Sequence, residues 1–157
     1  MVLVIWGRNV RLSKLTDYAT VILSVIAKKN TGVHAAMGIA EATGIAQPTV
    51  SKVLKLLVKA KVLISVRGAK GGYKLARSPE KISVAAVINA LEGPIALTEC
   101  SASHHACEQA RGCEIQGNWD LINKTVHNAL ESVTLADLIL PVSSPREVNI
   151  PVASLYR

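Results

Sequence analysis

The residues best suited to chemistry in this 157-residue chain are its three cysteines, Cys100, Cys107 and Cys113, which lie within fourteen residues of one another. Six and five residues separate them, whereas zinc ribbons and knuckles normally pair thiols two to four residues apart. Four thiolates, or three with one further donor, commonly hold an iron–sulfur cluster. Metal binding, redox chemistry and plain burial of the thiols are all open at this point, but ordering so polar a loop without a ligand would be costly.

Charge is distributed unevenly along the chain. Residues 1–81 hold 14 Lys and Arg and three acidic residues, which gives a net charge of +11. Residues 82–157 hold four Lys and Arg and eight acidic residues, which gives a net charge of −4. Such asymmetry indicates that the N-terminal half binds nucleic acid, although lysines that only solvate an Ala- and Val-rich surface would give the same composition. With no apolar run of membrane-spanning length and no signal-peptide pattern in residues 1–5, we expect a cytoplasmic protein with reduced thiols.

Ahead of the cysteines, the spacing of apolar residues predicts three helices. Residues 12–26 carry an apolar stripe that ends near Lys28 and Lys29, and residues 36–43 form a short second helix. Gly44 supplies the left-handed turn, and Pro48 suits the first turn of a third, amphipathic helix. Short helix, glycine turn and amphipathic helix together predict a helix-turn-helix.

The polar face of the third helix is equipped like a recognition helix. Hydroxyl and amide groups near its start would reach base edges in the major groove, and lysines along it would contact phosphates. A solvated helix face would look similar in isolation. The DNA contacts predicted from this helix are Gln47, Pro48, Thr49, Ser51, Lys52 and Lys55.

Residues 62–76 read as a β-hairpin with a glycine-rich turn, and every charged residue between Glu41 and Glu80 is basic. A basic hairpin after a recognition helix is a wing. Arg67, Lys70 and Tyr73 are therefore added to the predicted DNA contacts.

Beyond the wing, the pattern predicts a helix over residues 82–91, the cysteine loop, and a long helix from Ile115 with one apolar seam. A symmetric partner is the expected cover for this seam, and packing back onto its own module is the alternative. The predicted fold is mainly α with a small β-hairpin wing, a winged helix-turn-helix plus a long dimerisation helix. Its expected units are an N-terminal extension (1–9), the winged helix-turn-helix (10–81), a linking helix (82–97), a cysteine-rich loop (98–114), the dimerisation helix region (115–140) and a flexible tail (141–157).

Four features together resemble the IscR/NsrR-type winged-helix regulators that bind iron–sulfur clusters, over about residues 10–140. They are "RLSKLTDYA" from Arg11, "GIAQPTVSKVLKLL" from Gly44, "VRGAKGGYKLAR" from Val66, and the three-cysteine loop before a long helix. The first motif looks most like the SUF-regulator branch. The resemblance implies a homodimer that controls cluster-assembly or stress genes, with a cluster, most often 2Fe–2S, on the three cysteines. Members begin near the first motif, so Val10 is the expected start if its codon is GTG.

The fourth cluster ligand departs from the family pattern. The ISC-type regulator has a histidine three residues after its last cysteine, where this chain has Gln116. The nitric-oxide-sensing relative uses an aspartate in the first helix of the partner protomer, and Asp17 matches that position. His104 and His105 are the next candidates, because they are close to the thiols in sequence. The family's discriminating glutamate falls at Ser51, so the operator sequence does not carry over.

Cluster occupancy is expected to order residues 100–113 and to set the separation of two recognition helices on a palindromic operator. Either the cluster-loaded or the cluster-free form could be the tighter DNA binder. Two other functions remain candidates. One is an iron–sulfur carrier or electron-transfer protein that docks an acidic partner, and the other is a cluster-free thiol redox-sensing repressor. No phosphate loop, nucleophile elbow or paired carboxylates occur, so an enzyme is not expected.

Overall fold

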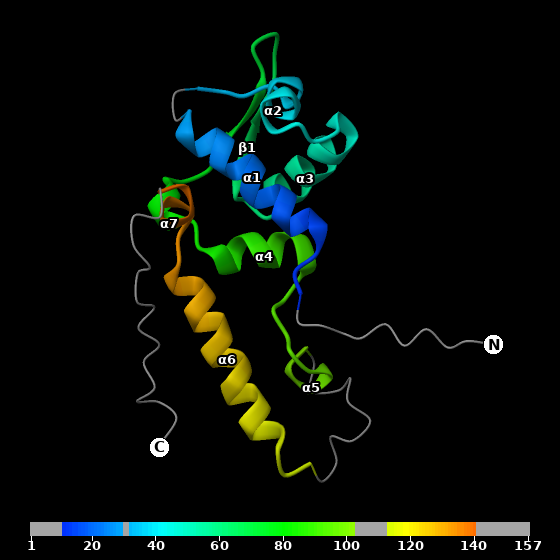
Figure 1. Cartoon of the computed structure of the whole chain (residues 1–157), viewed down its shortest axis with the longest axis vertical. Helices are drawn as coiled ribbons and strands as arrows, with labels where there is room; N and C mark the ends of the chain where they lie inside the picture. Colours follow the sequence, from blue (N-terminus) through cyan, green and yellow to red (C-terminus); the bar gives the residue numbers. More distant parts are fainter. Residues whose placement is uncertain (1–10, 30–31, 103–112, 141–157) are drawn as a thin grey trace, which may run out of the picture.

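The computed structural model of the chain describes residues 11–29, 32–102 and 113–140. It is mostly helical with one antiparallel hairpin, which confirms the predicted fold class (Figure 1). The elements are α1 (Lys14–Lys28), α2 (Ala36–Thr43), α3 (Gln47–Lys59), β1 (Leu63–Val66), β2 (Gly72–Leu75), η1 (Pro79–Lys81), α4 (Val84–Glu92), α5 (Glu99–Ala102), α6 (Gln116–Ser132) and α7 (Leu135–Ile139).

Helices α1, α2 and α3 enclose the core of the helix-turn-helix. Ile22 on α1 and Leu54 and Leu57 on α3 are completely buried, as the apolar spacing predicts. Gly44 caps α2 with a φ of 68°, in the left-handed region, which lets the chain turn directly into α3. Leu12 differs from the expected stripe, because α1 begins only at Lys14 and leaves it 46% exposed.

The wing is a two-stranded hairpin in which Leu63 pairs with Leu75 and Val66 with Gly72. Strand β2 is also joined to the segment before α2, where His34 and Tyr73 exchange two backbone hydrogen bonds of 2.9 Å. A Cβ atom on Gly72 would lie 2.4 Å from the carbonyl oxygen of His34. Only glycine therefore fits this junction without displacing backbone.

The long helix predicted near residues 115–140 is two helices. α6 ends at Ser132, and Thr134 starts α7 with a capping box in which its hydroxyl and the carboxylate of Asp137 exchange hydrogen bonds with each other's backbone. Leu135 is buried, and α7 packs against α1 and η1. Val133, which lies three residues after Leu130 and continues the apolar spacing of the helix, is extended backbone at the end of α6. The chain thus returns to the winged module after α6.

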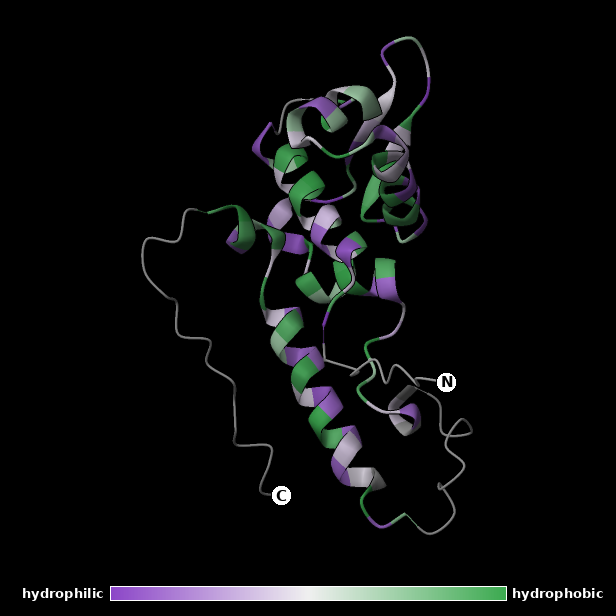
Figure 2. Ribbon diagram, turned by 45° about the vertical axis from the view of Figure 1, so that its right-hand side comes forward, coloured by the Kyte–Doolittle hydropathy of each residue, from purple (hydrophilic) through white to green (hydrophobic). Residues whose placement is uncertain are grey.

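Helix α6 projects away from the winged module, and its hydropathy alternates in bands along its length (Figure 2). Trp119 and Ile122 are 37% and 42% exposed on it. None of the helices in the described ranges is long and apolar enough to cross a membrane.

Candidate nucleic-acid interface and thiol region

The outward face of α3 carries the polar side chains predicted from the sequence. Gln47, Pro48, Lys52 and Lys55 are exposed, and Thr49 and Ser51 are half-buried. The N-terminus of α3 has no capping side chain and no acidic residue in its first turn. The helix dipole at this end therefore favours an anion such as a phosphate.

The wing stands at the same end of the molecule as α2 and α3 (Figures 1 and 2). Arg67 and Lys70 are exposed in its turn, whereas Tyr73 is half-buried and packs against the core. Between Glu41 and Glu80, every Lys and Arg is exposed and no acidic residue occurs. The helix-turn-helix and wing therefore form one positively charged surface, which suits the phosphate backbone of DNA.

The structure describes part of the predicted thiol site. Cys100 falls in α5, and Cys113, which is half-buried and not in a disulfide, lies three residues before α6. α5 packs against α6. Cys107, His104 and His105 lie outside the described residues.

Asp17, the first candidate for the fourth ligand, is exposed on the first turn of α1. Gln116 is the first residue of α6. Among residues 11–29, 32–102 and 113–140, no three His, Cys, Asp or Glu side chains gather where a metal ion could bind.

Sequence reasoning missed Asn123, which ties the segment before α5 to α6. Its Oδ1 accepts a hydrogen bond from the N–H of Leu97 at 3.0 Å, and its Nδ2 donates to the carbonyl of Ile95 at 3.1 Å. The one sequence signal is a polar amide beside the apolar seam, which alone does not identify its partners.

Glu92, at the end of α4, was also missed. Its Oε1 accepts hydrogen bonds from the N–H of Ser13 at 2.8 Å and from the hydroxyl of Thr16 at 2.5 Å. Glu92 therefore caps α1 from a distant part of the chain, where the Ser13 side chain makes no cap hydrogen bond of its own. Hydrogen bonding by Ser13, and then by Thr16, lowers the pKa of the Glu92 carboxyl, against a weaker effect of desolvation.

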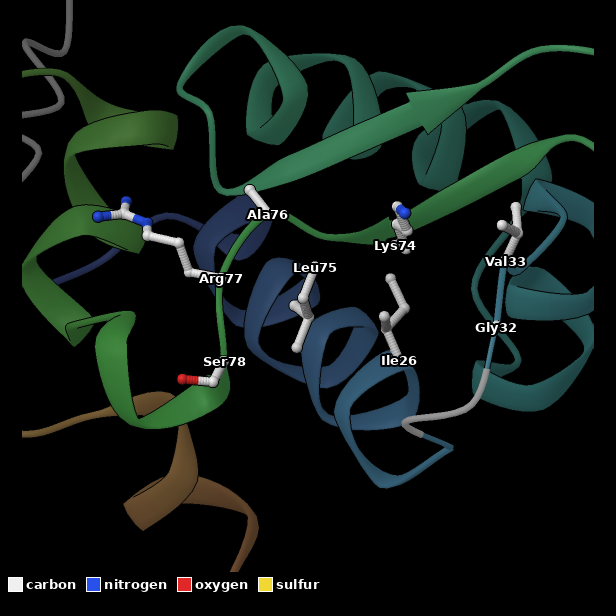
Figure 3. A pocket seen from close by; sticks show the side chains of 8 residues that line it. All are labelled: Ile26, Gly32, Val33, Lys74, Leu75, Ala76, Arg77 and Ser78. Carbon is white, nitrogen blue, oxygen red and sulfur yellow. The ribbon is translucent and has the colours of Figure 1, made fainter.

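A hollow of about 500 Å³ opens between the end of α1 and β2. The apolar side chains of Ile26 and Leu75 lie side by side in it, while Arg77 points away from them (Figure 3). The charged residues that line the hollow are Lys74 and Arg77, and its lining includes neither a thiol nor an acid. We assign no ligand to this hollow.

A basic helix-turn-helix with a wing, on a module that carries a projecting helix, defines a winged-helix transcriptional regulator. The profile of the Rrf2 family, described as an iron-dependent transcriptional regulator, matches residues 12–141. The chain therefore belongs to the Rrf2 family, and it is a DNA-binding transcriptional regulator.

Individual relatives agree with this assignment. The regulator NsrR of Oceanobacillus iheyensis is 34% identical over 134 residues, which are 82% of this chain and 88% of the relative. The structure of CymR, the global cysteine regulator of B. subtilis, has a TM-score of 0.64 at 30% identity and covers 83% of this chain and 97% of its own. IscR of T. potens gives 0.63 at 27% identity, covering 88% and 94%. The predicted resemblance to IscR and NsrR is confirmed, and these relatives are regulators rather than enzymes, as expected.

Proposed function

We propose that this protein is a homodimeric regulator whose affinity for its operator depends on an iron–sulfur cluster of the 2Fe–2S type. Cys100, Cys107 and Cys113 would hold the cluster. The observation that carries this proposal is the placement of Cys100 on a turn docked against α6, with Cys113 unpaired just before the same helix. Cysteines at both ends of one segment beside a single helix fit a group that takes several thiolates.

The cluster would supply iron–thiolate bonds that respond to iron supply, oxidants or nitric oxide. Asp17 is the first candidate for the fourth ligand, because its exposure on α1 leaves it accessible to a second protomer. His104 and His105 are the alternatives within the same chain. The proposed setting is the cytoplasm, and the proposed targets are genes of cluster assembly or stress.

A second copy of the chain is the proposed cover for α6. Ile115 is 57% exposed just before the helix, and Trp119 and Ile122 follow it along the apolar seam. Burying such side chains is worth roughly 25 cal/mol per Å² of apolar surface. A twofold dimer would present two α3 helices to successive major grooves of a palindromic operator, about one helical turn apart.

On the DNA, the side chains at the start of α3 would face the bases, and the lysines of α3 would face phosphates. Gln47, Thr49 and Ser51 form the first group, beside Pro48 at the helix start. Arg67, Lys70 and Tyr73 belong to the proposed wing contacts. Because Tyr73 packs against the core, it would position the backbone of the wing on the DNA rather than offer a free side chain.

Two hydrogen-bonded connections would carry a change in the thiol region to the DNA-binding module. At the end of α6, the carboxylate of Glu131 accepts a hydrogen bond of 2.8 Å from the buried hydroxyl of Ser83, at the start of α4. At the end of α4, Glu92 caps α1. A shift of α6 or of the segment after Glu92 would therefore change the position of α1. Helix α3 packs against α1 and would move with it.

Reconstitution with iron and sulfide under anaerobic conditions tests the cluster. The visible absorption of iron–thiolate bonds should appear in the parent protein, disappear in Cys107→Ala, and persist in Lys124→Ala, which changes an exposed residue of α6. An unchanged spectrum in Cys107→Ala would contradict the proposed ligand set.

Similarity to CymR of Staphylococcus aureus, whose structure has also been solved in an oxidized form, favours a second candidate function. Here two of the three thiols would form a disulfide on oxidation and alter DNA binding without iron. Iron analysis of anaerobically purified protein separates the two, because this candidate requires iron-free protein whose DNA affinity responds to a thiol oxidant. No observation favours the third function considered from the sequence, a carrier or electron-transfer role, in a chain of this family of transcriptional regulators.

A further inference from the structure

The side chain of Asn123 pairs with the backbone of an irregular segment as a neighbouring peptide group would. It accepts from Leu97 N–H and donates to Ile95 C=O, two residues earlier. This pattern needs an acceptor and a donor on one planar group, which a carboxamide supplies and a carboxylate does not. The half-buried position of Asn123 strengthens both hydrogen bonds by limiting competition from water.

The segment held by Asn123 leads directly into the turn that carries Cys100. The N–H of Ser101 donates to the carbonyl of Thr98 at 3.1 Å, and the hydroxyls of Thr98 and Ser101 lie 3.0 Å apart, so the turn is closed on itself. Ser101 also donates to Asp120 at 3.5 Å, a longer contact. Asp120 and Asn123 are three residues apart and share one face of α6.

The other end of the same segment is tied to α4. The N–H of Ile95 donates to Oδ1 of Asn89 at 3.2 Å, just beyond Gly93. Residues 95–97 are therefore held between an asparagine on α4 and an asparagine on α6. Ordering this irregular stretch costs conformational entropy, which the hydrogen bonds of the two asparagines help to offset.

We propose that Asn123 is a positioning residue for metal ligation, which keeps the backbone of Cys100 docked on α6, the helix that follows Cys113, before any metal binds. The proposal rests on the proposed function, because it assumes that these thiols act as ligands together. Asn123 itself does not touch the metal. Its effect is to raise the effective concentration of one thiol with respect to the others, and so the affinity of the site.

Anaerobic titration of the metal-free, full-length protein with Co²⁺ tests this, since thiolate-to-cobalt absorption reports ligation directly. Asn123→Ala is expected to weaken Co²⁺ binding about tenfold, equivalent to about 1.4 kcal/mol. Asn123→Asp, which keeps the acceptor but sets a carboxylate oxygen against the carbonyl of Ile95, should weaken Co²⁺ binding at least as much. The matched control is Asn118→Ala, an exposed asparagine on the same helix, which should bind Co²⁺ like the parent.

Hydrogen exchange of the metal-free protein supplies the second readout. The amides of residues 95–101 should exchange faster in Asn123→Ala, while those of α1 and α3 keep the protection they have in the parent. Unchanged Co²⁺ affinity in Asn123→Ala, with normal cobalt–thiolate absorption in the parent, would overturn this inference alone. A parent protein without cobalt–thiolate absorption would overturn the proposed thiol site, and the inference with it.

Discussion

At Glu92, one carboxylate oxygen serves two donors at the start of α1. A negative charge at a helix N-terminus is favoured by the helix dipole, and it replaces the cap that the Ser13 side chain does not provide. Thr16, one of the two donors, is only 1% exposed. Glu92 therefore joins the end of α4 to the first helix of the DNA-binding module.

Stability at acid pH should depend on Glu92. Because the folded state lowers the pKa of this carboxyl, its contribution is present above the unfolded pKa and is lost as the pH falls through the folded pKa. Glu92→Gln should lower the free energy of unfolding at pH 7 by about 0.5–1 kcal/mol, a modest value because the side chain is exposed. It should also flatten the fall in stability between about pH 5 and pH 3.

Urea unfolding across that pH range measures both effects. Glu80→Gln, which removes an exposed carboxylate from η1, is the control and should follow the parent curve. A Glu92→Gln variant with the parent's pH profile would show that the cap carries no stabilising charge.

Replacement by alanine should have opposite effects on stability at two glycines, Gly72 and Gly38. Gly72→Ala should destabilise the protein by about 1–3 kcal/mol, because the new Cβ would meet the carbonyl of His34 at 2.4 Å. Gly38→Ala, within α2 and with no atom near its Cβ position, should stabilise it by about 0.5–1 kcal/mol. Thermal or urea unfolding of both variants measures the difference, and equal stabilities would argue against the tight wing junction.

Among the elements, those with local start and stop signals were predicted well. Gly44 and Pro48 fix the turn into α3, and α2 has the bounds that its apolar spacing predicts. The break between α6 and α7 was not predicted, because the apolar spacing runs on to Val133, one residue past the end of α6. The break depends on the Thr134 capping box and on burial of Leu135 against the winged module.

Long-range hydrogen bonds explain what the sequence did not reveal about the candidate site. Asn123 and Ile95 are 28 residues apart, and Glu92 and Ser13 are 79 apart. Neither pairing produces a local pattern, because an asparagine on a helix and a glutamate before a glycine both occur on ordinary solvent-facing surfaces. The thiols and the basic surface, by contrast, were visible from residue type and spacing.

Helix α3 should bind phosphates independently of DNA sequence. Replacing Lys52 and Lys55 by Ala should weaken binding to every duplex and reduce the slope of log affinity against log salt by about 0.9 for each phosphate that is no longer neutralised. Lys124→Ala, on α6, is the control and should keep the parent slope. A slope that stayed at the parent value in the Lys52/Lys55 variant would mean that this face of α3 does not contact DNA.

For the molecule as a whole, the exposed seam of α6 predicts self-association. Ile122→Glu would place a charge where a second copy is expected to pack, so this variant should sediment as a monomer at concentrations where the parent is a dimer. Asn118→Ala should remain dimeric. Sedimentation velocity distinguishes the species, and a parent that is monomeric at micromolar concentration would contradict the proposed dimer.

Three parts of the molecule act together in the proposed regulation: a thiol region at the start of α6, hydrogen bonds from α6 and α4 to the winged module, and a basic surface on α3 and the wing. Coupling between two such sites typically amounts to about 1–3 kcal/mol, which changes an affinity by about five- to 150-fold. Such a change is large enough to regulate transcription without a large movement of the fold.

The most direct test compares the DNA affinity of iron-loaded and metal-free protein, both kept anaerobic, on a duplex that the protein itself has selected from a random pool. Iron and acid-labile sulfide are measured per protomer in the same samples. We expect the purified protein to contain both elements, and the two forms to differ in affinity at least about fivefold. Protein that contains neither iron nor sulfide and binds the duplex with the same affinity before and after reconstitution would contradict regulation by a cluster.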